Sequence, residues 1–322
     1  MKALIYNKFG GPDVLEWTDN WPDPAASPSG VLVRAAAGGL NPKDALLRKG
    51  KFSRTLARDP LPRASGMEVA GDVIAVGQDV SGFSVGDVVF GMTNRFSGGL
   101  HAEMAALEEN EITLVPTNVS TAAASAVPLA AQTALQALRD CCRIEAGQKV
   151  LINGASGGVG HFAVQIAKVL GAEAHAVCGA RNADFVRSLG ADAVYDYNAQ
   201  PAPEVDGRFD CVFDVFGRFT RADFKRQLGR GGIFVSTVPK FSTIGAELLA
   251  RIGAAKSSRL VGVRSDAADL RRIAQWMADG RVTPHVEAVY PVTRAADAHR
   301  HIESKHTVGK VVISFQEQGT AK

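Results

Sequence analysis

The chain has 322 residues, of which 46% are hydrophobic and 21% charged, and its formal net charge is +3. This balance is typical of a soluble globular protein with one large or two medium domains and a core of its own. The small net charge and the lack of a Lys/Arg cluster give no indication of a nucleic-acid or membrane partner.

The cysteines are few and irregularly spaced: Cys141, Cys142, Cys178 and Cys211. Such spacing argues against a disulfide framework and favours a reducing, cytoplasmic location. The apolar run at the N-terminus is too short for a signal peptide. The most apolar stretch, residues 122–138, contains Pro128 and Gln132 and falls short of the ~20 apolar residues that span a bilayer.

Short strands are predicted for the first 120 residues, where Val/Ile/Leu runs are cut by Gly, Pro, Asp and Asn. The predicted strands are residues 3–6, 31–35, 69–76, 87–90 and 112–115. Glycines recur between residues 71 and 91 at the close spacing of a compact, barrel-like β-domain.

The pattern changes near residue 120. An Ala-rich helix is predicted over residues 121–138, with Ser120 or Thr121 as its N-cap. Strands and helices then alternate, which predicts a parallel, doubly wound sheet. The strands are residues 149–153, 174–178, 209–214 and 233–237, and the helices are residues 159–170 and 183–189. A helix at 267–279 and a strand at 310–315 follow.

A glycine-rich turn lies between the first of these strands and its helix, with the spacing Gly154-x-x-Gly157-x-x-Gly160. Glycines let the backbone approach a pyrophosphate, and the start of a helix offers free N–H groups and the positive end of its dipole. The alternative is a tight strand–helix turn that binds nothing. The β-α-β context favours a dinucleotide site.

This loop, Ala155-Ser-Gly-Gly-Val-Gly160, resembles that of the zinc-independent quinone oxidoreductase and enone reductase branch of the medium-chain dehydrogenase/reductases, to which zeta-crystallin belongs. Further motifs agree in order and spacing, among them Asn41-Pro-Lys-Asp44, Gly66-Met-Glu-Val-Ala-Gly71 and Gly309-Lys-Val-Val-Ile313. The resemblance implies a Rossmann NADPH-binding domain at residues 123–264. It also implies a GroES-like, mostly β catalytic domain at residues 1–122 and 265–322.

Zinc ligands are missing at the positions where the resemblance puts them. Asn41 stands where the zinc-dependent relatives have their first Cys, Met67 replaces their His, and residues 92–112 hold no Cys cluster. We therefore expect no metal site. Glu68, left without its His, is predicted to be structural and paired with a nearby arginine.

For the substrate, the resemblance implies that Asn41 lies beside the nicotinamide and donates to a carbonyl oxygen that gains charge. Its alternative is a turn residue before Pro42. The resemblance also puts Thr133 near the nicotinamide. Lys51 and Arg48 are further polar candidates, with a solvated charge as the alternative for each.

Some relatives carry tyrosines where this chain has Leu46 and Phe52, so no tyrosine acid is expected here. The sequence provides no convincing general acid, and water is the expected proton source.

NADPH rather than NADH is expected, because no carboxylate occurs between Glu173 and Asp184, where an NAD site holds the ribose. Arg181 supplies a charged donor suited to a 2′-phosphate, with a solvated charge as its alternative. The resemblance adds Tyr197 and, more weakly, Lys310. The cofactor-binding residues expected are Ser156, Gly157, Gly158, Val159, Gly160, Cys178, Arg181, Tyr197, Gly217 and Lys310.

The function expected is NADPH-dependent hydride transfer to a quinone or an α,β-unsaturated carbonyl. Two alternatives stay open: a zinc-free ketone or aldehyde reductase, and a nucleotide-binding structural or redox-sensing protein with little turnover. A homodimer is also expected, paired through an apolar edge strand at residues 259–264.

Overall fold

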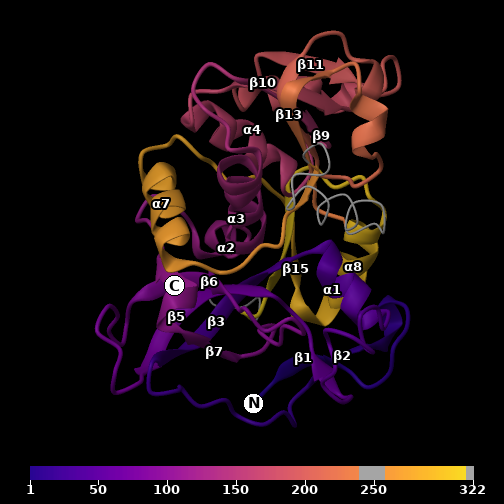
Figure 1. Ribbon diagram of the computed structural model, residues 1–322. Helices are drawn as coiled ribbons and strands as arrows, with labels where there is room; N and C mark the ends of the chain where they lie inside the picture. The colour runs from indigo at the N-terminus through magenta and orange to yellow at the C-terminus, as the bar shows by residue number, and fades with distance from the viewer. Residues whose placement is uncertain (239–257, 317–322) are drawn as a thin grey trace. The chain divides into compact units, whose positions relative to one another are not determined.

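The structure, a computed structural model, describes residues 1–238 and 258–316 (Figure 1). The chain divides into two units, one made of residues 1–129 and 264–322 and the other of residues 130–263. The first is called the β-rich unit below and the second the nucleotide unit. Among the described residues, no helix is long and apolar enough to cross a membrane.

The nucleotide unit is built on a parallel sheet, as predicted. Its strand order is β11-β10-β9-β12-β13-β14. The chain adds strands on one side of β9 and then on the other, beginning with β12, as in a doubly wound fold. The strands are β9 (Lys149–Asn153), β10 (Glu173–Cys178), β11 (Ala193–Asp196), β12 (Phe209–Asp214), β13 (Leu228–Ser236) and β14 (Ser258–Leu260). The bounds of β9 and β12 are those predicted, because strands buried on both faces read as continuous apolar runs.

Helices α4 (Gly160–Val169) and α5 (Ala183–Ser188) connect the first strands of this sheet. The single helix predicted over residues 121–138 is instead two helices, α2 (Thr121–Ser125) and α3 (Pro128–Gln136), followed by a π-helical turn. The break falls before Pro128 because proline restricts the preceding residue and has no N–H to donate. Ser120 is the N-cap of α2, accepting the Ala123 N–H at 3.2 Å.

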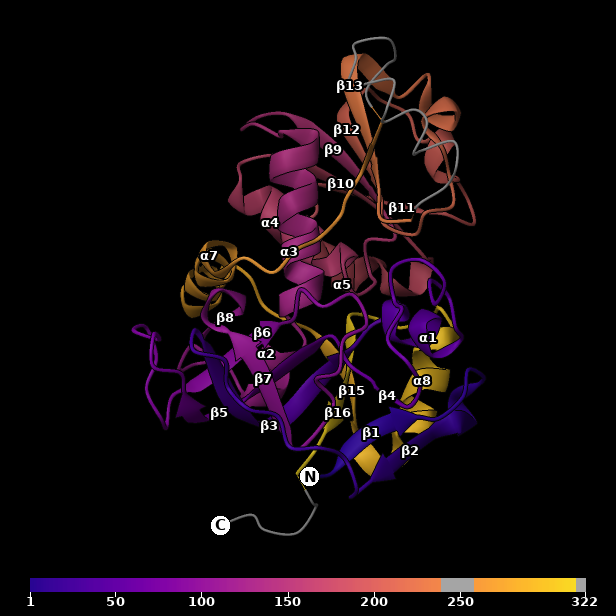
Figure 2. The same cartoon turned by 60° about the horizontal axis from the view of Figure 1, so that its bottom comes forward.

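The β-rich unit contains a seven-stranded sheet and a three-stranded sheet. The larger has the order β15-β16-β3-β5-β6-β8, with β7 also paired to β3; the smaller has the order β2-β1-β4. Its strands are β1 (Ala3–Tyr6), β2 (Leu15–Thr18), β3 (Gly30–Leu40), β4 (Arg63–Ala64), β5 (Glu68–Val76), β6 (Val88–Met92), β7 (Met104–Glu108), β8 (Ile112–Leu114), β15 (Val286–Pro291) and β16 (Lys310–Ser314). Figure 2 shows β1 and β2 side by side, as their antiparallel pairing requires.

Besides α2, the helices α1 (Pro42–Arg48), α7 (Ala267–Ala278) and α8 (Ala295–Glu303) belong to this unit. Arg48 joins α1 to α8, and the alternative of a solvated charge does not hold for it. Its side chain is fully buried, donates to the carbonyl of Gly10 and pairs with Glu303, which also binds Lys49. Burial of a guanidinium requires such a counter-charge, so Arg48 is a structural residue.

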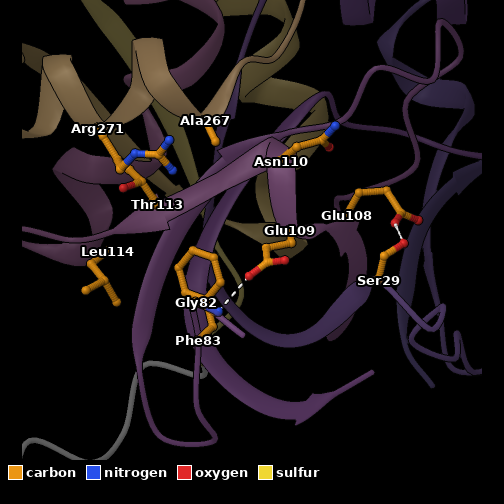
Figure 3. Close-up of a pocket in the computed structure, with 10 residues that line it drawn as sticks. All are labelled: Ser29, Gly82, Phe83, Glu108, Glu109, Asn110, Thr113, Leu114, Ala267 and Arg271. Carbon is orange, nitrogen blue, oxygen red and sulfur yellow. Dashed lines mark hydrogen bonds between the residues drawn. The ribbon is translucent and has the colours of Figure 1, made fainter. Parts of the chain in front are cut away.

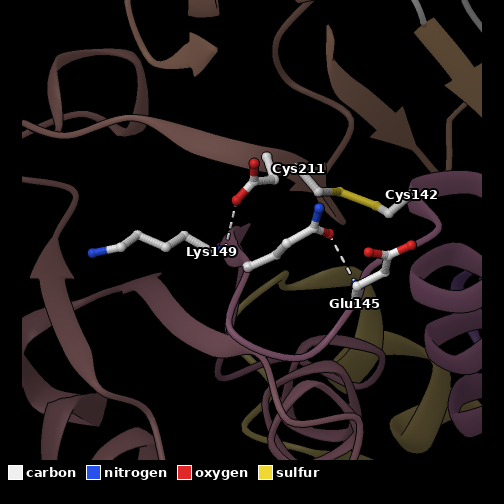
Figure 4. Close-up of a disulfide and its surroundings, with 6 residues drawn as sticks. Cys142, Glu145, Lys149 and Cys211 are labelled. Carbon is white, nitrogen blue, oxygen red and sulfur yellow. Dashed lines mark hydrogen bonds between the residues drawn. A yellow bond between two sulfur atoms is a disulfide. The ribbon is translucent and has the colours of Figure 1, made fainter. Parts of the chain in front are cut away.

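A disulfide joins Cys142, at the end of the π-helical turn, to Cys211 in β12, although the cysteine spacing argued against a disulfide framework (Figure 4). Their Cα atoms lie 5.8 Å apart, a distance ordinary for disulfides, although 69 residues separate them in sequence. Cys141 and Cys178 are free thiols. The bridge ties the segment before β9 to a central strand of the parallel sheet.

Candidate functional site

The glycine loop follows β9 and opens α4. Gly154 has φ +88°, a left-handed conformation that favours glycine. A Cβ at Gly160 would lie 2.0 Å from the Gly154 carbonyl oxygen, so only glycine lets the helix start this close to the strand. Ser156, Gly157, Gly158 and Val159 between them are partly exposed. The geometry fits a pyrophosphate cradle at a helix N-terminus.

The loop after β10 lies next to the end of β11. Cys178 is buried, and burial raises the pKa of its thiol to about 11, so it stays protonated. A Cβ at Gly179 would meet the Tyr197 hydroxyl at 3.1 Å, so the structure brings Tyr197 against this loop. Arg181 is exposed in the following turn. A cavity of about 340 Å³ opens here, lined by Cys178, Gly179, Ala180, Ala183, Asp184, Arg187, Val194, Tyr195 and Asp196.

The sequence did not indicate two charged residues in this cavity, Asp196 and Arg187. The Asp196 carboxylate comes from β11 and accepts the Ala180 N–H at 3.2 Å. A search for carboxylates in the loop after β10 misses it, because only strand pairing brings it there. Asn182 precedes α5, and its side-chain amide donates to the Ser156 hydroxyl at 3.1 Å, which links the two loops.

Gly217 lies in the loop after β12, the strand next to β9. Its φ is +66°, and its N–H donates to the buried Asp214 carboxylate at 3.1 Å. Asp214 also accepts the Asn153 side chain at 2.8 Å and the Phe219 N–H at 2.8 Å. This one carboxylate therefore shapes the loop at the switch point of the sheet, where doubly wound folds bind ligands.

A buried polar cluster in the β-rich unit contains Asn41, Glu68 and Lys310. The Lys310 ammonium lies 2.7 Å from Glu68 Oε1 and 2.6 Å from Asn41 Oδ1, and the Asn41 amide donates to Glu68 Oε1 at 2.8 Å. Glu68 Oε2 accepts the Leu129 N–H at 2.7 Å. Glu68 is fully buried, and such a carboxylate requires this number of donors.

This cluster corrects one expectation. The cation paired with Glu68 is Lys310 rather than an arginine. The ammonium of Lys310, a predicted cofactor-binding residue, is buried and held by Asn41 and Glu68. The pairing joins residues 242 positions apart, which no local pattern reveals.

An apolar group packs around Met67, which is itself buried. Leu47 and Ala57 belong to it, with Phe52, Phe96 and Leu129 against it. The Lys43 ammonium lies 4.1 Å from the centre of the Phe96 ring, and burial lowers the pKa of Lys43. Lys43 is thus a partly buried cation beside an aromatic ring, and the sequence did not indicate it.

The other two predicted catalytic residues have different surroundings. Thr133 is buried on α3, in the nucleotide unit. Lys51 is exposed in the turn after α1. Asn41 belongs to the buried cluster of the β-rich unit.

A cavity of about 660 Å³ in the β-rich unit lies elsewhere (Figure 3). It is lined by Ser29, Gly82, Phe83, Glu108, Glu109, Asn110, Thr113, Leu114, Ala267 and Arg271. Its two carboxylates are already occupied: Glu109 accepts the Gly82 N–H at 2.6 Å, and Glu108 accepts the Ser29 hydroxyl at 2.9 Å. None of the predicted site residues lines it, so its size does not identify the site.

Within residues 1–238 and 258–316, no three His, Cys, Asp or Glu side chains lie close enough together to hold a metal ion. His101 is buried, with Nε2 3.2 Å from the Gly39 carbonyl oxygen, and burial lowers its pKa to about 4. His299 is buried in α8 and has no hydrogen-bond partner among the described residues. Burial and the nearby Arg48 charge lower its pKa to about 3.

Comparisons with known proteins agree with this geometry. The alcohol dehydrogenase GroES-like domain matches residues 27–117, and a family described as zinc-binding dehydrogenase matches residues 189–313. The chain is 33% identical to the NADPH-dependent alkenal/one oxidoreductase, chloroplastic, of Arabidopsis thaliana, over 97% of this chain and 79% of that protein. It is 31% identical to the chloroplast envelope quinone oxidoreductase homolog of the same plant, over 97% and 98%.

Among solved structures, the quinone oxidoreductase from Coxiella burnetii superposes with a TM-score of 0.88 at 28% identity, over 98% of this chain and 99% of that one. An NAD-dependent alcohol dehydrogenase superposes with a TM-score of 0.84 at 29% identity, over 98% and 100%. The fold and the site thus define a medium-chain dehydrogenase/reductase. Within that superfamily, the chain belongs to the quinone oxidoreductases and alkenal/one reductases, and the predicted resemblance and fold class are confirmed.

The burial of Asp44 predicts how the free energy of unfolding depends on pH. Asp44 Oδ2 accepts the Asn41 backbone N–H at 2.8 Å, and burial, assisted by the Glu68 charge, raises the pKa of Asp44 from 3.8 to about 7. Between about pH 4 and pH 7 the folded state therefore binds the Asp44 proton and the unfolded state does not. The contribution of Asp44 to the free energy of unfolding falls as pH rises through this window, by at most about 1.4 kcal/mol per pH unit.

Asp44→Asn removes this ionisation and can still accept the Asn41 N–H. Relative to wild type, its free energy of unfolding should rise from pH 4 to pH 7 and then stay level. Urea unfolding across this pH range measures the difference in the free energy of unfolding between the two proteins. His101 and His299 contribute equally to both proteins, so their opposite pH dependence cancels. Asp72→Asn, at an exposed position of β5, is the control. Parallel curves for wild type and Asp44→Asn would contradict the raised pKa.

Proposed function

We propose that this protein uses NADPH to reduce a quinone, or the carbon–carbon double bond of an α,β-unsaturated carbonyl compound, without zinc. Its relatives include an NADPH-dependent alkenal/one oxidoreductase and quinone oxidoreductases. The observation that carries the proposal is the Asn41 carboxamide, held between Lys310 and Glu68. By the resemblance, this is where zinc-dependent relatives have a metal ligand.

The residues that would hold the cofactor fit it. The loop from Ser156 to Gly160 leads into the start of α4, whose free N–H groups suit a pyrophosphate, and Gly160 lets the helix start close to the strand. Arg181 and Tyr197 are proposed for the 2′-phosphate, since both lie in or against the loop after β10. When bound, the cofactor supplies a hydride.

Asn41 is proposed to donate a hydrogen bond to the substrate oxygen as that oxygen gains negative charge. Hydride added to the β-carbon moves the electron pair of the double bond toward this oxygen, and a proton from water completes the reduction at the α-carbon. With a quinone, the same hydrogen bond stabilises the hydroquinone anion. No metal is needed for either step.

A second candidate, reduction of a simple ketone or aldehyde, is favoured by the similarity to the NAD-dependent alcohol dehydrogenase structure. The decisive measurement is NADPH oxidation with 1,4-naphthoquinone, 2-hexenal and 2-butanone in parallel. We expect turnover of the first two, unchanged by a chelator, and well under one zinc per purified chain. Turnover of 2-butanone alone would favour the second candidate. Tight NADPH binding without turnover of any substrate would favour a nucleotide-binding protein that is not an enzyme.

Cofactor preference is tested at Arg181. A charge-assisted hydrogen bond contributes about 1.5–3 kcal/mol, so Arg181→Ala should weaken NADPH binding by roughly ten- to a hundredfold. NADH binding should hardly change, because its 2′-hydroxyl carries no charge. Fluorescence titrations of both cofactors measure this, with Arg226→Ala, at another exposed arginine of the nucleotide unit, as the control. Equal wild-type affinities for the two cofactors would refute the preference, and an unchanged mutant would refute the role of Arg181.

A homodimer is also proposed, with a cytoplasmic location. Among the described residues β14 is the last strand of the parallel sheet, and pairing it across a two-fold axis would satisfy the backbone groups on its outer side. The strand is shorter than predicted, Ser258–Leu260 rather than residues 259–264. Light scattering should give twice the chain mass of 33.9 kDa. A mass of one chain at micromolar concentration would exclude the dimer, and cell fractionation tests the location.

A further inference from the structure

The Asn41 carboxamide is held by opposite charges at its two ends. Its oxygen lies 2.6 Å from the Lys310 ammonium, and its nitrogen lies 2.8 Å from Glu68 Oε1. All three side chains are at least 97% buried, so water does not screen these contacts. Turning the amide over would put its oxygen against the carboxylate and its N–H groups against the ammonium. The two charges therefore fix one orientation.

This arrangement also leaves one N–H group of the Asn41 side chain available as a donor. An asparagine amide has two N–H groups, and Glu68 takes one of them. The other has no partner among the described residues. Hydrogen bonds in a chain polarise one another, so a cation on the amide oxygen makes the remaining N–H a stronger donor. The ammonium acts like the metal of a zinc site, with its charge transmitted through the amide.

Glu68 holds Lys310 in this place, and Gly39 leaves room for the Glu68 carboxylate. Glu68 is the counter-charge that makes burial of the ammonium tolerable. A Cβ at Gly39 would lie 2.2 Å from Glu68 Oε1, so β3 has room for the carboxylate only because this residue is glycine. The neighbouring carboxyl, Asp44, binds the Asn41 backbone N–H rather than its side chain.

We propose that Lys310 is a positioning residue that orients and polarises the Asn41 carboxamide, so that its second N–H serves as the donor to the substrate oxygen. This inference rests on the proposed function for its catalytic part. The polarisation itself is a property of the resting protein. The two parts are therefore tested separately.

The first test does not involve turnover. Protein labelled with ¹⁵N in its asparagines gives a side-chain amide signal for Asn41, assigned by its loss in Asn41→Ala. A cation on the amide oxygen strengthens the partial double bond between carbon and nitrogen and slows rotation about it. In Lys310→Met, exchange between the two amide hydrogens should accelerate severalfold and the signals should move. Lys149→Met, at an exposed lysine of β9, should change neither. An unchanged Asn41 signal in Lys310→Met would overturn the proposal.

Lys310→Met leaves a buried carboxylate without its counter-charge and is expected to destabilise the fold. Lys310→Met combined with Glu68→Gln removes both charges and keeps an acceptor for the Asn41 amide. The faster exchange should persist in this double variant. Thermal unfolding identifies which variant is folded well enough to be measured. If the double variant is folded and its exchange rate equals that of wild type, the proposal is wrong.

The second test is a kinetic cycle with 2-hexenal and 1,4-naphthoquinone. Lys310→Met should lower kcat about ten- to a hundredfold, with KM and the NADPH dissociation constant changed less than about threefold. Lys310→Arg should recover part of kcat. If Lys310 acts through Asn41, Lys310→Met should cost little further in an Asn41→Ala background. Fully multiplicative losses would overturn the proposal. Absence of any turnover in wild type would instead refute the proposed function, while the amide spectra would still decide whether Lys310 polarises Asn41.

Discussion

Burial of one carboxylate, that of Glu68, is the constraint around which the β-rich unit is organised. A charge removed from water costs several kcal/mol unless donors replace the lost hydration. Glu68 obtains its donors from β16, from the residue before α1 and from the start of α3. Strands and helices far apart in sequence must therefore meet at this point. The same contacts fix the position of Asn41, so the requirement for stability and the geometry of the site have one origin.

The sequence predicts the nucleotide unit better than the β-rich unit, for a physical reason. Parallel strands such as β9 and β12 are buried on both faces, and their apolar runs end where the strands end. β3 shows the opposite case. Its prediction covered residues 31–35, whereas the strand continues to Leu40 through alanines and glycines that have weak strand propensity. Those small residues are required because His101 and Glu68 pack against Gly38 and Gly39.

The features that the sequence could not predict are contacts between distant residues. The glycine loop is local, so its spacing alone indicates a dinucleotide site. Lys310 and Glu68, by contrast, are 242 residues apart, and each taken alone looks like an ordinary charged residue. The disulfide between Cys142 and Cys211 and the approach of Asp196 to Ala180 are of the same kind. Each depends on which strands are neighbours, and the order of strands in a sheet is a property of the whole fold.

The group that stabilises the substrate oxygen also determines which substrates a site of this kind suits. A divalent metal bound directly to oxygen can stabilise an alkoxide, whereas a single ammonium acting through an amide offers a weaker field. Reduction of a simple ketone develops a localised alkoxide, which needs the stronger field. Hydride addition to an enone or a quinone develops an anion that is delocalised over several atoms and needs less stabilisation. The proposed donor, an Asn41 amide whose oxygen accepts from the Lys310 ammonium, therefore matches the second class of reaction better than the first. If Asn41 is the donor proposed above, the charge in the cluster suits conjugated substrates for a chemical reason that does not depend on sequence similarity.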